Sequence, residues 1–221
     1  MTEIPPQSEA APPASQPPMQ PWLRRLFRRF GLAMLLAILL SAVALSDRTV
    51  EHTGDNVQLA LPLSGLACAV ATGQGVKYVG RFVLLFSIYT GSKRGLGEVP
   101  LNERPNGGYA GFPSGHTSAS TFGATWLAGT CLAQSPVAQG VAILAAGFVG
   151  GTRIEHGSHN VWQVLAGGFL GWMIQFLPLT WFDRGFRRTV TAAGRGIRAA
   201  ALTLWGLGLI GWRRLRAQRN R

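Results

Sequence analysis

The stretch that decides the fold is residues 112–134, FPSGHTSASTFGATWLAGTCLAQ, in which a turn-forming segment from Phe112 to His116 runs directly into an uncharged, largely apolar stretch. That stretch, 117–134, has the length that a helix needs to cross a bilayer core of about 30 Å. Further apolar runs of similar length lie at 30–46, 57–73, 76–91, 137–152 and 161–182. We therefore expect an all-α, polytopic membrane protein built as a six-transmembrane-helix bundle.

The composition agrees with a membrane environment. The chain of 221 residues is 47% hydrophobic and only 14% charged, whereas about a quarter of the residues in a soluble domain are charged. A net charge of +12 can indicate nucleic-acid binding. Here, however, the basic residues flank the apolar runs and form no patch interleaved with aromatic residues. We expect the lipid bilayer, and no nucleic acid, as their partner.

The positions of Lys and Arg set the expected topology, because cytoplasmic loops of membrane proteins carry the excess of positive charge. With six spans and both termini in the cytoplasm, the outer side holds only Arg48, Lys93, Arg94, Arg104 and Arg153 of the 21 basic residues. Short loops and an outer-face site favour a bacterial inner membrane. A cleavable signal peptide ending at Ala42-Val43-Ala44 is the alternative interpretation of the first apolar run.

This topology divides the chain into four segments. Residues 1–21 are a disordered, Pro-rich cytoplasmic tail, 22–56 the first transmembrane helix with a short outer loop, 57–182 a core of five transmembrane helices, and 183–221 a basic cytoplasmic tail. Within the last segment, 199–212 is short for a span and predicts an interfacial helix on the inner leaflet. Arg81, near the start of the third run, is expected to snorkel to the interface.

The two cysteines give no sign of a covalent or metal site. Cys68 and Cys131 fall inside apolar runs, and their spacing suggests neither a disulfide nor a metal. We expect both to be small buried hydrophobic residues. Dinucleotide-binding, P-loop and HExxH patterns are also absent from the sequence, so nucleotide and zinc chemistry have no support.

Two expected outer loops, 91–116 and 150–163, break the charge bias. Their cations and histidines are Lys93, Arg94, Arg104, His116, Arg153, His156 and His159. Converging guanidinium groups match the oxygens of a phosphate. The expected helix begins at Ser114-Gly115-His116, and the free backbone amides at a helix N-terminus attract anions. Two histidines on separate loops can divide phosphoryl transfer, one attacking phosphorus and one protonating the leaving oxygen. Each feature alone is common, but together they predict a phosphate site.

These residues resemble the type 2 phosphatidic-acid phosphatase superfamily, also called lipid phosphate phosphatases. The family pattern is a lysine, six residues and Arg-Pro, then Pro-Ser-Gly-His, then Ser-Arg, five residues, His, three residues and Asp. The chain has Arg104-Pro105, the complete Pro113-Ser114-Gly115-His116, and Arg153 followed after five residues by His159. The resemblance covers roughly residues 57–182.

The resemblance implies a six-helix core with its site at the outer, periplasmic surface, and neither a metal nor an organic cofactor. By that analogy His159 is the nucleophile that forms a phosphohistidine, and His116 is the acid. The phosphate would be held by Lys93, Arg104, Arg153, Ser114 and the amide of Gly115. Arg153 would also stabilise the charge that develops during transfer.

Two departures from the family pattern leave the expected chemistry in place. Ten residues, in place of six, separate Lys93 from Arg104. We expect an inserted segment around 98–103, which leaves Lys93, or alternatively Arg94, in the lysine role. Thr152 replaces the serine before the second arginine and keeps its hydroxyl group.

The third departure concerns the nucleophile. Gln163 stands where the family has the aspartate that orients the histidine. A glutamine oxygen can fix the histidine tautomer, but it brings no charge. Glu155 is a candidate for supplying that charge, with a simple pairing to Arg153 or solvent as the alternative.

The expected function is hydrolysis of a membrane lipid phosphate or pyrophosphate at the outer leaflet. The resemblance offers undecaprenyl pyrophosphate, phosphatidylglycerophosphate, phosphatidate and lipid A phosphates, and the sequence does not choose among them. Transfer of the phosphoryl group to another lipid stays open, because a hydroxyl group can intercept a phosphohistidine. Binding of lipid phosphates without turnover is the third possibility, which the retained histidines disfavour. The oligomeric state also stays open.

Overall fold

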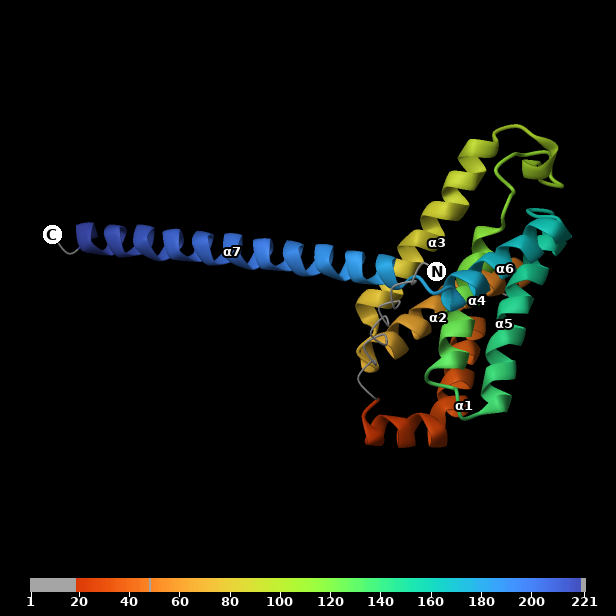
Figure 1. Ribbon diagram of the computed structural model, residues 1–221, viewed down its shortest axis with the longest axis horizontal. Coiled ribbons are helices and arrows are strands. Elements are labelled where there is room, and N and C mark those ends of the chain that lie inside the picture. The colour runs from red at the N-terminus through yellow and green to blue at the C-terminus, as the bar shows by residue number, and fades with distance from the viewer. Residues whose placement is uncertain (1–18, 48, 220–221) are drawn as a thin grey trace, which may run out of the picture.

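The computed structural model describes residues 19–47 and 49–219, and within them the chain is all-helical, without strands (Figure 1). The helices are α1 Pro21–Ala44, α2 Val50–Ala71, α3 Gly75–Leu96, η1 Pro100–Asn102, α4 Gly115–Gly129, α5 Pro136–Glu155, α6 Val161–Phe176 and α7 Thr180–Arg219. The all-α prediction is confirmed. Most of the expected disordered tail, and Arg48 of the expected first outer loop, lie outside the described residues.

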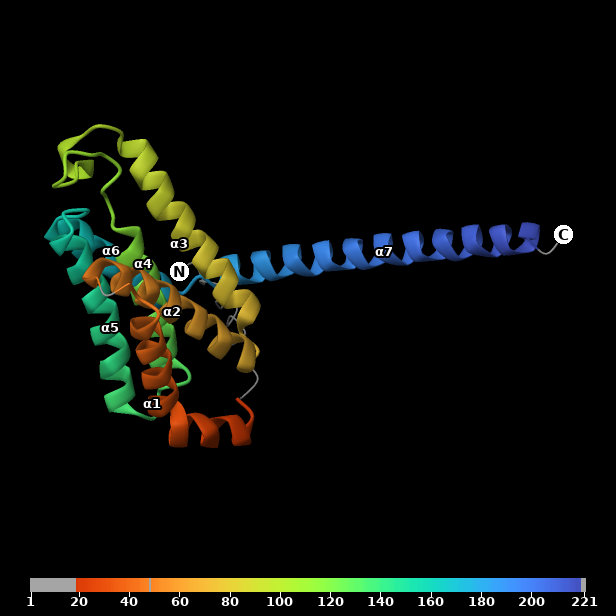
Figure 2. The same cartoon turned by 180° about the vertical axis from the view of Figure 1, so that it is seen from behind.

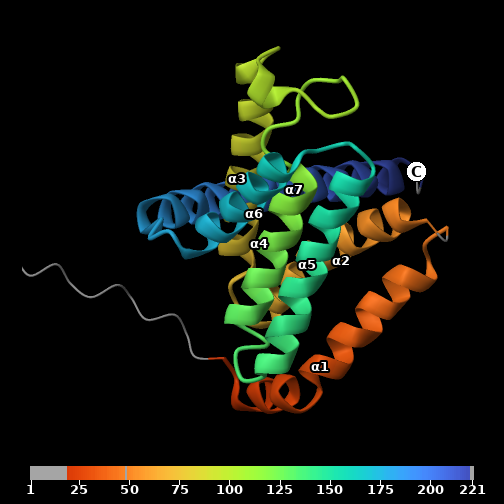
Figure 3. The same ribbon diagram turned by 90° about the vertical axis from the view of Figure 1, so that its right-hand side faces the viewer.

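Helix α4 lies at the centre of the bundle, between α2, α5 and α6 (Figure 3). Small residues allow its neighbours to come close. Gly167 and Gly171 of α6 lie against the backbone carbonyls of Ser114 and Ser118, and Gly123 of α4 lies against the backbone of α2. A side chain at any of these glycines would meet backbone atoms, so the packing depends on small residues, as is common between membrane helices.

An aromatic cluster joins α3 to α4. Tyr78 of α3 stacks near Phe82 and meets Phe122 and Trp126 of α4. The hydroxyl of Tyr78 donates a 2.7 Å hydrogen bond to the carbonyl oxygen of Pro62 in α2. This bond gives the buried phenol a partner and fixes the position of α3 on the bundle.

Arg81 corrects an expectation. Its side chain does not reach outward, since the residue is only 4% exposed. Two guanidinium nitrogens contact the carboxylate of Asp183 in α7, at 2.8 and 3.1 Å, and a third donates to the carbonyls of Ile174 and Gln175. The arginine therefore caps the C-terminal end of α6 and ties α7 to it, because unpaired carbonyls at a helix end need donors.

Helix α7 leaves the bundle as one long helix (Figure 2). The chain bends by 77° between residues 161–176 and 180–198. The expected interfacial helix at 199–212 forms part of α7, although the side chains of that stretch, apart from the exposed Trp205, lie outside the described ones.

Apolar helices indicate a membrane protein. By length and composition, α1 and α5 can each cross a membrane, and the bent pair of 161–176 with 180–198 adds a third span if it is a single broken one. Helix α4 is shorter, with 15 residues, and both α2 and α3 carry charged side chains near their ends. The bundle of six spans stays a prediction.

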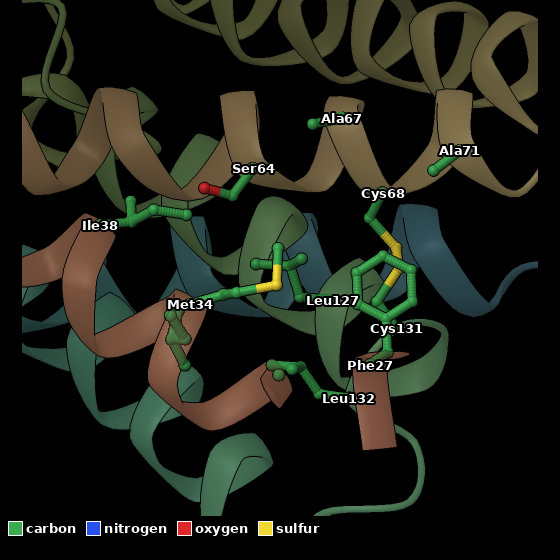
Figure 4. Close-up of a pocket in the computed structure, with 12 residues that line it drawn as sticks. Phe27, Met34, Ile38, Ser64, Ala67, Cys68, Ala71, Leu127, Cys131 and Leu132 are labelled. Carbon is green, nitrogen blue, oxygen red and sulfur yellow. A yellow bond between two sulfur atoms is a disulfide. The ribbon is translucent and has the colours of Figure 1, made fainter. Parts of the chain in front are cut away.

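The cysteines also correct an expectation. Cys68 near the end of α2 and Cys131 after α4 are buried, as predicted, but they form a disulfide. Their separation of 63 residues hid the pairing, because the sequence does not show which helix ends are neighbours. The disulfide lies at the edge of an apolar pocket of about 250 Å³ between α1, α2 and α4 (Figure 4).

Candidate active site

The two loops that the sequence analysis singled out meet at one end of the bundle. The segment between α3 and α4 and the connection between α5 and α6 lie at the same end in Figure 1. The amide of Asn106 donates to the carbonyl of Gly157 at 3.2 Å, and the amide of Ser114 donates to the carbonyl of Gln163 at 2.9 Å. These backbone bonds hold the loops in fixed register, so the residues that they carry share one site.

Gln163 holds His159 in one orientation. The Nδ1 atom of His159 lies 3.2 Å from Oε1 of Gln163. The amide nitrogen of Gln163 donates to the carbonyls of Leu101 and Glu103, at 3.2 and 2.7 Å. Because carbonyls can only accept, the amide oxygen must face the ring, and Nδ1 must carry the proton. Nε2 is then the ring nitrogen with a lone pair for attack.

The local sequence explains why Gln163 occupies this place. Asn160 caps α6 and accepts a 2.9 Å bond from the amide of Gln163, while Oε1 of Gln163 accepts from the amide of Asn160 at 3.2 Å. This reciprocal pair is a capping box. It places the glutamine on the first turn of α6, where its side chain is fully buried. There it lies within hydrogen-bond distance of His159, which is 3% exposed.

His159 is held neutral. Burial lowers the pKa of its imidazole to about 4, and the nearby Lys93 and Arg104 contribute in the same direction against the hydrogen bond to Gln163. A neutral imidazole keeps the lone pair that a nucleophile needs. The arrangement therefore suits attack on an electrophile over most of the pH range.

Two cations, Lys93 and Arg104, lie near His159. Lys93 is partly buried, and burial together with Arg104 lowers the pKa of its ammonium group. Its neighbour Arg94 is exposed, so the structure turns Lys93, and not Arg94, toward the site. Arg104 donates to the carbonyl of Ala110 at 3.1 Å, while its Nε is buried without a hydrogen-bond partner among the described residues. A buried donor of this kind fits an anion.

Ser114 and Gly115 lie at the N-terminus of α4, where the sequence predicts phosphate binding. Ser114 is fully buried, and its Oγ accepts from the amide and the hydroxyl of Thr117, at 3.4 and 3.0 Å. Gly115 lies against the ring of Tyr89, which a larger residue would displace. The first amides of a helix lack intrahelical partners and attract anions. The predicted phosphate-binding segment thus lies at a helix N-terminus, next to His116.

The structure adds Asp55, which the sequence analysis missed. Its Oδ1 lies 3.0 Å from Nη1 of Arg153 and 3.4 Å from Nε2 of His116. Arg153 is 4% exposed and also donates to the carbonyl of Glu51 at 3.1 Å. A signal was present: Asp47, Glu51 and Asp55 recur every four residues, which places Glu51 and Asp55 on one face of a helix.

His116 lies among opposing charges. Burial lowers the pKa of its imidazole, and Arg153, Lys93 and Arg104 lower it further, whereas Asp55 raises it. The residue is more open than His159, with a side chain that is 41% exposed. Its ring can therefore reach a bound molecule from the open side of the site.

Asn102 is a second residue that the sequence analysis missed. It lies in the 3-10 helix η1, within the expected insertion at 98–103, and is 1% exposed. Its side chain donates to the carbonyls of Lys93 and Gly97, at 2.9 and 2.7 Å, and accepts from the amide of Phe112 at 3.0 Å. The extra residues form a compact turn that ties the end of α3 to the segment before α4.

Glu155 does not have the contact proposed for it. Its side chain is exposed, and among the described residues it makes neither a hydrogen bond nor an ion pair with His159. It follows Arg153 by two residues on α5, so it points away from the face that Arg153 presents to the site. His156 is also outside the cluster, since it pairs with Glu51 at 3.1 Å and with Ser158 at 2.6 Å.

Comparison with known proteins gives the family. A search of curated proteins and a search of solved structures each found no match. A protein-family model, described as the PAP2 superfamily, matches residues 30–187. This range covers α2 to α6 and every residue of the site described above. Members of this superfamily are phosphatases. The chain belongs to the PAP2 superfamily.

Proposed function

We propose that the protein hydrolyses a lipid phosphate or pyrophosphate at the outer face of the membrane through a phosphohistidine on His159. One observation carries the proposal: His159 is buried, neutral and held at Nδ1 by Gln163, beside the cations Lys93 and Arg104. A protein that only binds phosphate would need the cations but not an oriented, neutral histidine. A ring nitrogen with a free lone pair and a fixed direction serves attack.

The reaction has two steps. In the first, Nε2 of His159 attacks phosphorus, and the bond from phosphorus to the leaving oxygen breaks. The leaving oxygen keeps the two electrons of that bond and takes a proton from His116. In the second, a water molecule gives a proton to the now neutral His116 and attacks the phosphohistidine. The phosphorus–nitrogen bond breaks, its electrons return to Nε2 of His159, and inorganic phosphate leaves.

The surrounding groups stabilise the transferred phosphoryl group. Lys93, Arg104 and Arg153 neutralise charge on its equatorial oxygens, a role that metal ions take in many other phosphoryl-transfer enzymes. Ser114 and the amide of Gly115 bind it from the end of α4. Arg104 and Arg153 are already held by hydrogen bonds to the carbonyls of Ala110 and Glu51 before substrate arrives, which limits the reorganisation needed in the transition state.

The lipid substrate and the topology rest on the membrane character of the chain. The site lies at one end of a bundle whose outer surface carries large exposed apolar side chains. Six spans with both termini in the cytoplasm place most of the basic residues inside, and then α4 begins at the outer, periplasmic face of a bacterial inner membrane. A headgroup phosphate at that interface can reach His159 while its tails stay in the bilayer.

The test uses purified full-length protein in detergent with a panel of lipid phosphates and pyrophosphates. Wild type is expected to release phosphate from at least one of them, and His159→Ala is expected to release none above background. Brief reaction with a 32P-labelled substrate and an alkaline quench is expected to leave acid-labile label on wild type alone. Equal phosphate release by both proteins would end the proposal, and labelled lipid products in place of free phosphate would favour phosphoryl transfer between lipids.

A further inference from the structure

We propose that Asp55 of α2 is a positioning residue that keeps a proton on His116 for delivery to the leaving oxygen. The inference rests on the function proposed above. Oδ1 of Asp55 is a buried atom that lies 3.4 Å from Nε2 of His116 and 3.0 Å from Nη1 of Arg153. Neither contact has hydrogen-bond geometry, so both are ion-pair contacts. The carboxylate thus lies between the acid of the reaction and a phosphate-binding cation.

Helix packing fixes the position of Asp55. Gly54, the preceding residue, is buried against the side chain of Thr152 on α5, where a Cβ atom would overlap the threonine. On the same side, the backbone carbonyl of Glu51 accepts from Arg153 at 3.1 Å. These two contacts with α5 fix the backbone of α2 at Asp55 and direct its carboxylate to Arg153 and His116.

The charges around His116 show why a negatively charged partner is needed to keep its ring protonated. Lys93 faces it from α3, Arg104 from the following loop and Arg153 from α5, whereas Asp55 on α2 is the anion that acts on it. Burial and the cations favour a neutral ring, and a neutral ring cannot donate a proton to an alkoxide. Asp55 opposes them and lies within reach of the nitrogen that would carry the proton.

Asp55 could instead serve only to orient Arg153. The two roles differ in their dependence on the leaving group. A residue that supports proton donation matters for an alkyl phosphate, whose leaving oxygen needs a proton. It matters little for p-nitrophenyl phosphate, whose leaving group departs as a stable anion. A residue that only orients Arg153 affects both substrates alike, because both present the same phosphate.

The experiment compares Asp55→Asn with wild type on an n-alkyl phosphate and on p-nitrophenyl phosphate. The kcat for the alkyl ester is expected to fall about 10-fold to 100-fold, within the usual contribution of general acid catalysis, and that for p-nitrophenyl phosphate by less than about threefold. The alkaline limb of the alkyl-ester profile is also expected to move to lower pH. Asp47→Asn, an identical change at an exposed residue, is the matched control and is expected to leave both rates unchanged.

Activity on p-nitrophenyl phosphate shows that the variant is folded, so a selective loss cannot come from misfolding. An equal loss on both substrates, or an unmoved alkaline limb, would overturn the role of Asp55. These outcomes differ from a failure of the proposed function, in which wild type itself would form no phosphohistidine.

Discussion

The side-chain oxygen of Gln163 lies 3.2 Å from Nδ1 of His159, while the nitrogen of the same amide donates to the carbonyls of Leu101 and Glu103. One side chain thus orients the proposed nucleophile and anchors the segment that leads to Arg104. An aspartate could perform only the first task, because a carboxylate has no proton to donate. The departure from the family pattern therefore fits this chain, whose loop before Arg104 is longer.

Restoring the family's acidic residue is expected to lower activity. Gln163→Asp is too short to span from His159 to the loop, and Gln163→Glu turns a second acceptor toward two carbonyl oxygens. Each buried group left without a partner costs about 1–3 kcal/mol, so we expect a reduced kcat and lower thermal stability for both variants. Phosphate release and thermal unfolding in detergent measure these effects.

Gln163→Glu also makes a prediction about pH. Its negative charge beside the ring raises the pKa of His159, so the acid limb of the kcat/KM profile is expected to move to higher pH. Gln139→Glu is the control, because Gln139 donates to a carbonyl at the other end of the bundle. A Gln163→Asp variant more active than wild type would contradict the anchoring role.

The pH dependence of the wild type follows from its two histidines. The pKa of His159 is lowered to about 4, and attack requires the neutral ring, so activity is lost as pH falls through that value. The pKa of His116 is lowered from 6.5, and donation requires the protonated ring, so activity on alkyl phosphates is lost as pH rises toward neutrality. We expect a bell-shaped kcat/KM profile with a mildly acidic maximum. A maximum at alkaline pH would contradict the assignment of the acid.

The parts of the site that could be predicted were those that the sequence holds close together. Ser114, Gly115 and His116 are adjacent, and Arg153 at the end of α5 precedes His159 by only six residues, so their spacing along the chain pointed to them. The all-helical fold followed from apolar runs of helical length.

The parts that could not be predicted depend on which helices are neighbours. Asp55 reaches Arg153 only because α2 lies against α5, and Asp183 lies 102 residues from Arg81. The pairing of Cys68 with Cys131 has the same origin. Spacing along the chain does not specify such contacts. The four-residue recurrence that includes Glu51 and Asp55 was a visible hint that one acidic face of α2 has a partner.

A small change at Gly111 is expected to alter the orientation of His159 indirectly, by displacing the side chain of Gln163. A Cβ atom at this position would lie 2.5 Å from Nε2 of Gln163 and 2.8 Å from its Cδ and Oε1. Gly111→Ala must therefore push the amide away from His159 or move the segment before α4, and we expect kcat to fall about 10-fold to 100-fold, since displacements of about 1 Å have effects of this size. Gly151→Ala is the control, because a Cβ there meets no atom of the described residues within 4 Å. Unchanged turnover in Gly111→Ala would show that Gln163 does not need its present position.

In purified, oxidised protein the disulfide is expected to stabilise the bundle without contributing to the reaction. Cys68 lies near the C-terminal end of α2, whereas Asp55 lies near its N-terminal end, so the disulfide is remote from the site. A link across 63 residues stabilises by about 4 kcal/mol in the chain-entropy account. Cys68→Ser with Cys131→Ser is therefore expected to unfold at a lower temperature, with kcat unchanged when assayed well below it. Thermal unfolding with and without a reductant measures the first effect, and only wild type is expected to respond to the reductant. A loss of activity at low temperature would mean that the α2–α4 contact, held by the disulfide at one end, also positions Asp55 at the other.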